Sequence, residues 1–208
     1  MITATAILSV SALTHASLRS ATIELAGAIK FSYDRAIMEK RIQRIGMDID
    51  KGIWWLDYTE DQYSLAAERL RGKEGEKALD GQEIEEKVKD LDSFFDFDDG
   101  VEVKQAIEGG KAAQFVPDEE VGKPTPLPSG IRFGKVWTGH QEEPFTSGVA
   151  YLHFFKGGWS EPAQIELTDE DDYITLKVSP LTGRVRTYQK QLDDPEAEEN
   201  DGREEGDE

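Results

Sequence analysis

The first forty residues constrain the fold of this chain more than any other feature. Apolar and small residues recur there at three- and four-residue steps, which places them on one face of a helix; they are Leu18, Ala21, Leu25, Ala28, Ile29, Ser32 and Ala36. No proline occurs before Pro117, and Gly27 is the one glycine in the segment. The pattern predicts a helix from Thr3 to Lys40, about 55 Å long. A helix of that length extends beyond what one domain of this size can cover.

Residues 1–16 form an apolar opening segment that allows three interpretations. A transmembrane helix needs about 20 apolar residues, and this run is shorter and contains threonine and serine. A secretory signal peptide cleaved after Ala16 needs a basic start, yet no Lys or Arg precedes Arg19. The third interpretation is the second half of a longer apolar helix that begins upstream of Met1. We favour the third because it explains both the shortness and the missing charges.

Alternating runs after the helix predict antiparallel strands. The runs 45–49 and 54–58 flank Asp50-Lys51-Gly52, which is typical of a β-hairpin. Trp54 and Trp55 are expected to pack, one on the helix and the other over a sheet edge. Short strands return from residue 131, at 131–138, 148–155, 163–167, 173–180 and 181–189, with Ile131, Phe133 and Lys135 sharing one face of the first. The predicted class is α+β, a long N-terminal α-helix packed on an antiparallel β-sheet or sandwich head.

The net charge of −19 is unevenly distributed and helps to divide the chain. Acidic residues dominate a glycine- and proline-punctuated stretch after the hairpin and the C-terminal end, while the segments that alternate are nearly neutral. This distribution argues against a nucleic-acid surface, which needs clustered Lys and Arg. The expected parts are an apolar helix part (1–16), an amphipathic helix with the first hairpin (17–59), an acidic, partly mobile insertion (60–128), the remaining β part of the head (129–192) and a disordered acidic tail (193–208).

The sequence contains no recognised catalytic, cofactor or metal motif. The histidines are His15, His140 and His153, and they have no metal-ligand spacing. The acidic run Asp96, Asp98, Asp99 and Glu102 does not fit an EF-hand loop and is interpreted as a solvated turn, although a different calcium site stays open. No phosphate-binding glycine motif or nucleophile elbow occurs. The sequence therefore predicts no enzyme, no cofactor and no metal.

Two stretches resemble a known family. Residues 17–57, "SLRSATIELAGAIKFSYDRAIMEKRIQRIGMDIDKGIWWLD", look like the start of the soluble part of a minor pseudopilin of the GspH/FimT family of type II secretion. "FFKGGWSEPAQIEL" (154–167) and "YITLKVSPLTGRVRTY" (173–188) look like the closing strands of that family. "MITATAILSVSAL" is similar to the second half of the family's apolar helix. The family's leader, methylated first residue and following glutamate are absent from this sequence.

The resemblance implies a structural subunit of the type II secretion pseudopilus with a type IV pilin-like fold. Such a subunit is held in the bacterial inner membrane by its N-terminal helix, with the β head in the periplasm, and assembles with other pseudopilins to help export proteins across the outer membrane. Secreted cargo is a further possible partner. Two alternatives stay open, a FimT-like minor pilin for DNA uptake or adhesion and a free periplasmic protein-binding module. The expected assembly and packing residues are Leu8 and Leu13 against neighbouring helices and Leu18, Leu25 and Ile29 partly against the protein's own sheet.

Overall fold

The computed structural model describes residues 3–61, 63, 65, 113–119, 121–141 and 143–192, with side chains from residue 14 onward. The chain divides into two compact units, one formed by Met1–Tyr58 with Pro117–Glu208 and the other by Thr59–Val116. In the second unit the rings of Tyr63 and Phe115 meet edge to face, 5.3 Å apart. Most of the acidic insertion, including the acidic run at residues 96–102, and the acidic tail lie outside the described residues.

The first unit contains one long helix, α1 (Thr3–Glu39). Its bounds agree with the predicted helix to within one residue. The helix ends where Lys40 adopts a left-handed backbone conformation with a φ of 53°, a common way for a helix to stop. No helix in the described part of the chain is both long enough and apolar enough to span a membrane.

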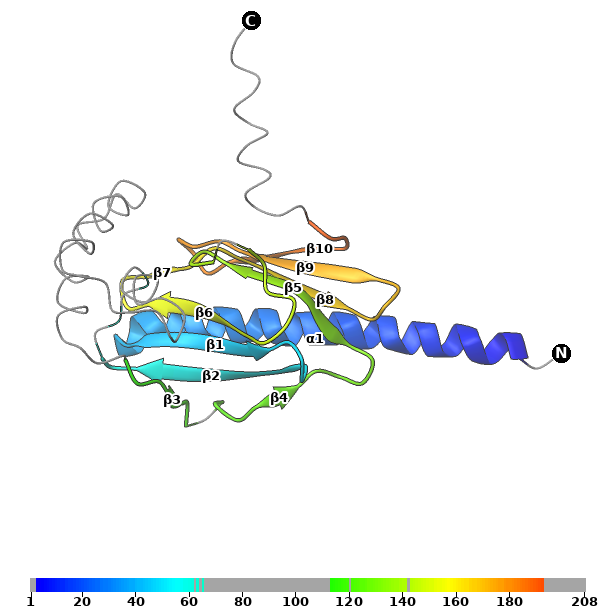
Figure 1. Cartoon of the computed structure of the whole chain (residues 1–208), viewed down its shortest axis with the longest axis horizontal. Helices are drawn as coiled ribbons and strands as arrows, with labels where there is room; N and C mark the ends of the chain where they lie inside the picture. Colours follow the sequence, from blue (N-terminus) through cyan, green and yellow to red (C-terminus); the bar gives the residue numbers. More distant parts are fainter. Residues whose placement is uncertain are drawn as a thin grey trace, which may run out of the picture. The chain divides into compact units, whose positions relative to one another are not determined.

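The strands form two sheets, and the predicted α+β class is confirmed. The first sheet has the order β3-β2-β1-β6-β7, with β4 paired to β2, and the second has the order β10-β9-β8-β5. The strand bounds are β1 Ile42–Asp48, β2 Ile53–Thr59, β3 Val116–Pro117, β4 Thr125–Pro126, β5 Arg132–Thr138, β6 Val149–Phe155, β7 Trp159–Ser160, β8 Ala163–Thr168, β9 Tyr173–Val178 and β10 Val185–Tyr188. Helix α1 contacts β1 and β6 of the first sheet and β8, β9 and β10 of the second, and its N-terminal end extends beyond the strands (Figure 1).

The core lies between α1 and the two sheets. Leu18, Leu25 and Ile29 of the helix are fully buried, and they pack with inward residues of both sheets such as Ile45, Met47, Leu152, Phe154, Ile165 and Leu176. Burying each large aliphatic side chain contributes about 1.5–3 kcal/mol. The core therefore fixes α1 and both sheets as one unit.

Strand β5 departs from the predicted alternation. The pairing of β5 with β8 shifts register between Phe133 and Val136, which marks a β-bulge. As a result Val136 is buried, while Lys135 is exposed. The expectation that Lys135 shares a face with Ile131 and Phe133 was therefore wrong, because simple alternation does not foresee an inserted residue.

The two tryptophans and the connector after residue 116 also depart in part from expectation. Trp54 is buried against the core, whereas Trp55 lies over Gly46 of β1 and meets the Tyr151 ring edge to face rather than covering a sheet edge. In the connector, the side chain of Asp118 is buried, paired with Arg35 and Arg41. The proline-rich connector was predicted to be exposed; most of its described residues are, and the ion pairs of Asp118 explain this buried exception.

Candidate functional site

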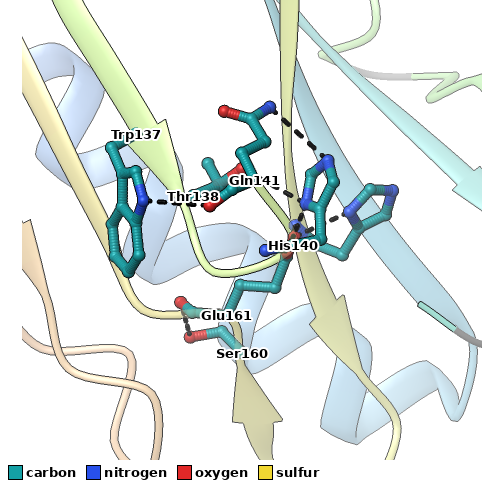
Figure 2. A network of polar contacts seen from close by, with 7 residues as sticks. Trp137, Thr138, His140, Gln141, Ser160 and Glu161 are labelled. Atoms are coloured by element: carbon teal, nitrogen blue, oxygen red, sulfur yellow. Dashed lines mark hydrogen bonds and ion pairs between the residues drawn. The ribbon is translucent and has the colours of Figure 1, made fainter. Parts of the chain in front are cut away.

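A buried polar cluster stands where the chain crosses from the first sheet to the second. Its members are His140 from the turn after β5, His153 from β6 and Glu161 from the short link between β7 and β8. Figure 2 labels His140 and Glu161. The side chains of Glu161 and His153 are 1% and 2% exposed, and that of His140 is 22% exposed. The cluster therefore has one edge that reaches solvent, at His140.

The carboxylate of Glu161 is the centre of the cluster. Its Oε2 accepts the backbone N–H of His153 at 2.9 Å and lies 2.8 Å from Nδ1 of that residue. Its Oε1 accepts the backbone N–H of His140 at 3.2 Å and pairs closely with Nδ1 of the same residue. Each oxygen thus contacts both the backbone and the ring of one histidine. The arrangement satisfies a buried carboxylate that would otherwise be costly.

The two imidazole rings are held near each other by this shared carboxylate. Their centroids lie 5.6 Å apart with the ring planes at 70°. Tyr151 and Phe155 lie to either side of His153 along β6, each 6.4 Å from its ring, and Gln141 Nε2 lies 3.5 Å from His140 Nε2. The rings are therefore positioned from several directions rather than by one contact.

Local sequence features bring the link and the turn together. Gly139 donates its backbone N–H to the carbonyl of Pro162 at 3.0 Å, and a Cβ at Gly139 would lie 2.8 Å from the Pro162 ring. The N–H of Glu161 donates to the carbonyl of His153 at 3.1 Å. A glycine followed by a histidine in the turn is thus needed for the close approach that lets His140 reach Glu161.

Electrostatics keep Glu161 ionised. Burial by itself would raise the pKa of this carboxyl, but the charges and hydrogen bonds of His153 and His140 outweigh burial and lower the pKa from 4.5 to about 2. At neutral pH the site therefore presents a buried carboxylate between two imidazoles. Such a donor set can bind a cation or hold a proton.

The sequence analysis missed this cluster. It treated the three histidines as scattered, and the structure brings His140 and His153 together on Glu161. The missed residues lie on a turn, a strand and a link between sheets, so no fixed spacing in the sequence signals their meeting. His15 lies elsewhere, with its Nδ1 3.1 Å from Asp172 Oδ2. The general expectation of no metal site stays a prediction at this point.

The predicted assembly residues fall into two groups. Leu8 and Leu13 lie within α1, and their side chains are outside the described residues. Leu18, Leu25 and Ile29 are each 0% exposed in the protein's own core. These three side chains are therefore covered by the protein's own sheets, which leaves them no surface for a neighbouring subunit.

The outward face of α1 carries apolar side chains that the sequence analysis did not single out. They are Ile23 and Met38, each 73% exposed, with Phe31 and Ile37 at about 40%. Beside them is a hollow of about 400 Å³ between α1 and the segments around β2 and β4, lined among others by Gly27, Phe31, Trp54 and Val121. These residues form an apolar surface on the same helix that carries the apolar opening segment.

Among known proteins, similarity to this chain is found in solved structures. No family model matches the chain, and no curated protein matches it. Two solved structures of the minor pseudopilin EpsH from the type II secretion system of Vibrio cholerae are similar to it. One has a TM-score of 0.48 and 9% identity over 86% of this chain and 99% of that chain; the other has a TM-score of 0.45 and 12% identity over 86% and 96%.

Proposed function

We propose that this chain is a structural subunit, a minor pseudopilin that joins the type II secretion pseudopilus through α1 and helps to drive protein export across the outer membrane. In this proposal the N-terminal helix is held in the bacterial inner membrane, the β head lies in the periplasm, and the chain has no enzymatic activity. Its partners are other pseudopilins, with secreted cargo as a further candidate.

The main support for the proposal is the difference between the N-terminal end of α1 and the part of α1 that packs on the head. The helix runs unbroken for 37 residues, but the described part of its buried stripe begins only at Leu18. The N-terminal end of α1, which belongs to the apolar opening segment, extends beyond the strands (Figure 1), and the helix first meets the head near His15, which pairs with Asp172. An apolar helix that its own head does not cover needs lipid or other helices around it, which is the situation of a subunit in a helical fibre.

The outward apolar face of α1 supports the same function. Ile23, Phe31 and Met38 are exposed on the part of the helix that the head holds. Exposed large apolar side chains on one helix face are a common mark of a protein–protein contact. The proposal assigns this face to contacts with neighbouring subunits in the fibre.

Cysteine cross-linking tests the proposal cleanly because the chain has no cysteine of its own. We would introduce Ile23→Cys in the full chain, produce it in its native host and treat the membrane and sheared-fibre fractions with a thiol cross-linker. We expect cross-links to other pseudopilins from Ile23→Cys, and none from the matched variant Leu25→Cys, which is buried two positions away.

Deletion of the gene gives the second readout. We expect loss of type II export, restored by the wild-type chain. Normal export after deletion, together with the absence of cross-links from Ile23→Cys, would show that the chain is not a working subunit of the pseudopilus.

A further inference from the structure

We propose that His140, His153 and Glu161 bind one divalent transition-metal ion of the zinc class, and that the ion braces the junction between the two sheets. The inference is independent of the proposed function. It departs from the expectation of no metal that the sequence alone gave, because the three residues meet only in the folded chain.

The three residues lie close enough together to share one ion. Each of the three residues offers a ligand atom, and these atoms all lie within 4.8 Å of one another. Zinc binds imidazole nitrogen and carboxylate oxygen at about 2.0–2.2 Å, so ligands around one tetrahedral ion lie about 3.4 Å apart. Adjustments of about 1 Å in side-chain position would bring all three onto a single ion. A water molecule would complete the coordination.

The donor atoms are those that a transition metal prefers. Two imidazoles and one carboxylate suit zinc and its neighbours in the first transition row, whereas calcium and magnesium prefer all-oxygen sites.

Backbone hydrogen bonds and packing hold the cluster in place. The backbone N–H groups of His140 and His153 both donate to Glu161, so the carboxylate is fixed before any ion arrives. His153 is packed along β6, while His140 keeps a solvent-facing edge through which an ion could enter. By contrast, the second group that could hold an ion, His15 with Asp169 and Asp172, is more exposed and joins a helix to a turn.

The position of the site suggests what the ion does. His153 belongs to β6 of the first sheet, and His140 follows β5 of the second, with Glu161 on the link between them. An ion bound there would connect the two sheets by bonds that unfolding must break. It would therefore act on stability, and its binding is measurable without any assay of export.

The experiment uses the full chain without a histidine tag, stripped with a chelator and then titrated with zinc chloride by calorimetry in millimolar calcium and magnesium. The excess of those ions occupies the acidic segments. We expect one zinc per chain, at least tenfold weaker binding in His140→Gln and unchanged binding in the control His15→Gln. Zinc should also raise the melting temperature of the wild type and of His15→Gln, but not that of His140→Gln.

A measurement on the unaltered protein covers the case in which His140→Gln does not fold. The chain has three histidines, so the imidazole signals in a nitrogen–proton correlation spectrum can be followed individually. We expect zinc to shift two of the three and leave His15 in place. Absence of zinc binding, binding that His140→Gln leaves unchanged, or a shift confined to His15 would each overturn the proposal.

Discussion

Two buried regions of the first unit solve opposite problems. Under α1, Leu18, Leu25 and Ile29 lose all contact with water and are held by apolar packing on both sheets. At the junction of the sheets, Glu161 is as deeply buried but carries a charge, and it is held by two imidazoles and two backbone N–H groups. The first region gains stability from its burial, while the second must first offset the cost of removing a carboxylate from water.

The two regions should respond differently to substitution. Apolar packing is spread over many contacts, so its loss scales with the volume removed. The polar junction depends on a few directional partners, so removal of one leaves another unsatisfied. Substitutions in the two regions should therefore give measurably different losses of stability.

The largest effect should come from Leu25→Ala. Leu25 is 0% exposed in the middle of the helix–sheet interface, and truncation leaves a cavity that costs about 3–4 kcal/mol of unfolding free energy. Urea unfolding followed by circular dichroism measures the loss. Ile23→Ala on the same helix is the control, because Ile23 is 73% exposed and should change stability by less than about 0.5 kcal/mol. Similar losses for the two variants would contradict the described packing of α1.

The free energy of unfolding should depend on pH through the junction at Glu161. Because the pKa of Glu161 is lower in the folded chain than its ordinary value of 4.5, ionised Glu161 stabilises the fold above about pH 4.5. That contribution is lost progressively as the pH falls towards 2, and the full shift corresponds to about 3 kcal/mol. We expect the unfolding free energy of the wild type to fall across this window by more than that of Glu161→Gln, which has no carboxyl at this position.

The matched control for the pH experiment is Glu170→Gln. The side chain of Glu170 is 73% exposed, so this variant should follow the wild-type curve at every pH. At pH 7, Glu161→Gln itself should lose about 2 kcal/mol, because an amide cannot accept all the donors that face it. Parallel pH curves for the wild type and Glu161→Gln would show that the junction does not stabilise the fold through its charge.

These two regions also differ in how far the sequence predicts them. The apolar stripe follows a three- and four-residue period, so the helix Thr3–Lys40 and its inward residues could be predicted, and the structure has Thr3–Glu39. Alternation also predicted a strand at 173–180, and the structure has Tyr173–Val178. Periodicity failed at Val136, where a bulge shifts the register. It could not reveal the meeting of His140 and His153 on Glu161, since that depends on how two sheets join.

Gly46→Ala, on the outer face of the first sheet, should lower stability by a smaller amount. A Cβ at Gly46 would lie 2.4 Å from the ring of Trp55, and Trp55 is held by a 3.0 Å hydrogen bond to Asp57 and by the ring of Tyr151. The ring must therefore move, which costs about 1–3 kcal/mol. Thermal unfolding measures the cost. The double variant Gly46→Ala with Trp55→Leu should lose less than the sum of the two single changes, and strict additivity would argue against the contact.

The smallest effect has the opposite sign and concerns the outward face of α1. Gly27 is exposed within the helix, and a Cβ there would meet no atom within 4 Å. Gly27→Ala should therefore stabilise the isolated chain by about 0.5–1 kcal/mol, because alanine loses less conformational entropy in a helix. Urea unfolding measures the gain, and Ala28→Gly at the next position should show a loss.

Gly27 also lines the hollow beside Phe31 and Trp54. If neighbouring subunits fill that hollow, Gly27→Ala should lower the cross-linking yield of Ile23→Cys while raising stability. A stabilised chain with unchanged cross-linking would place the subunit contact elsewhere on the helix.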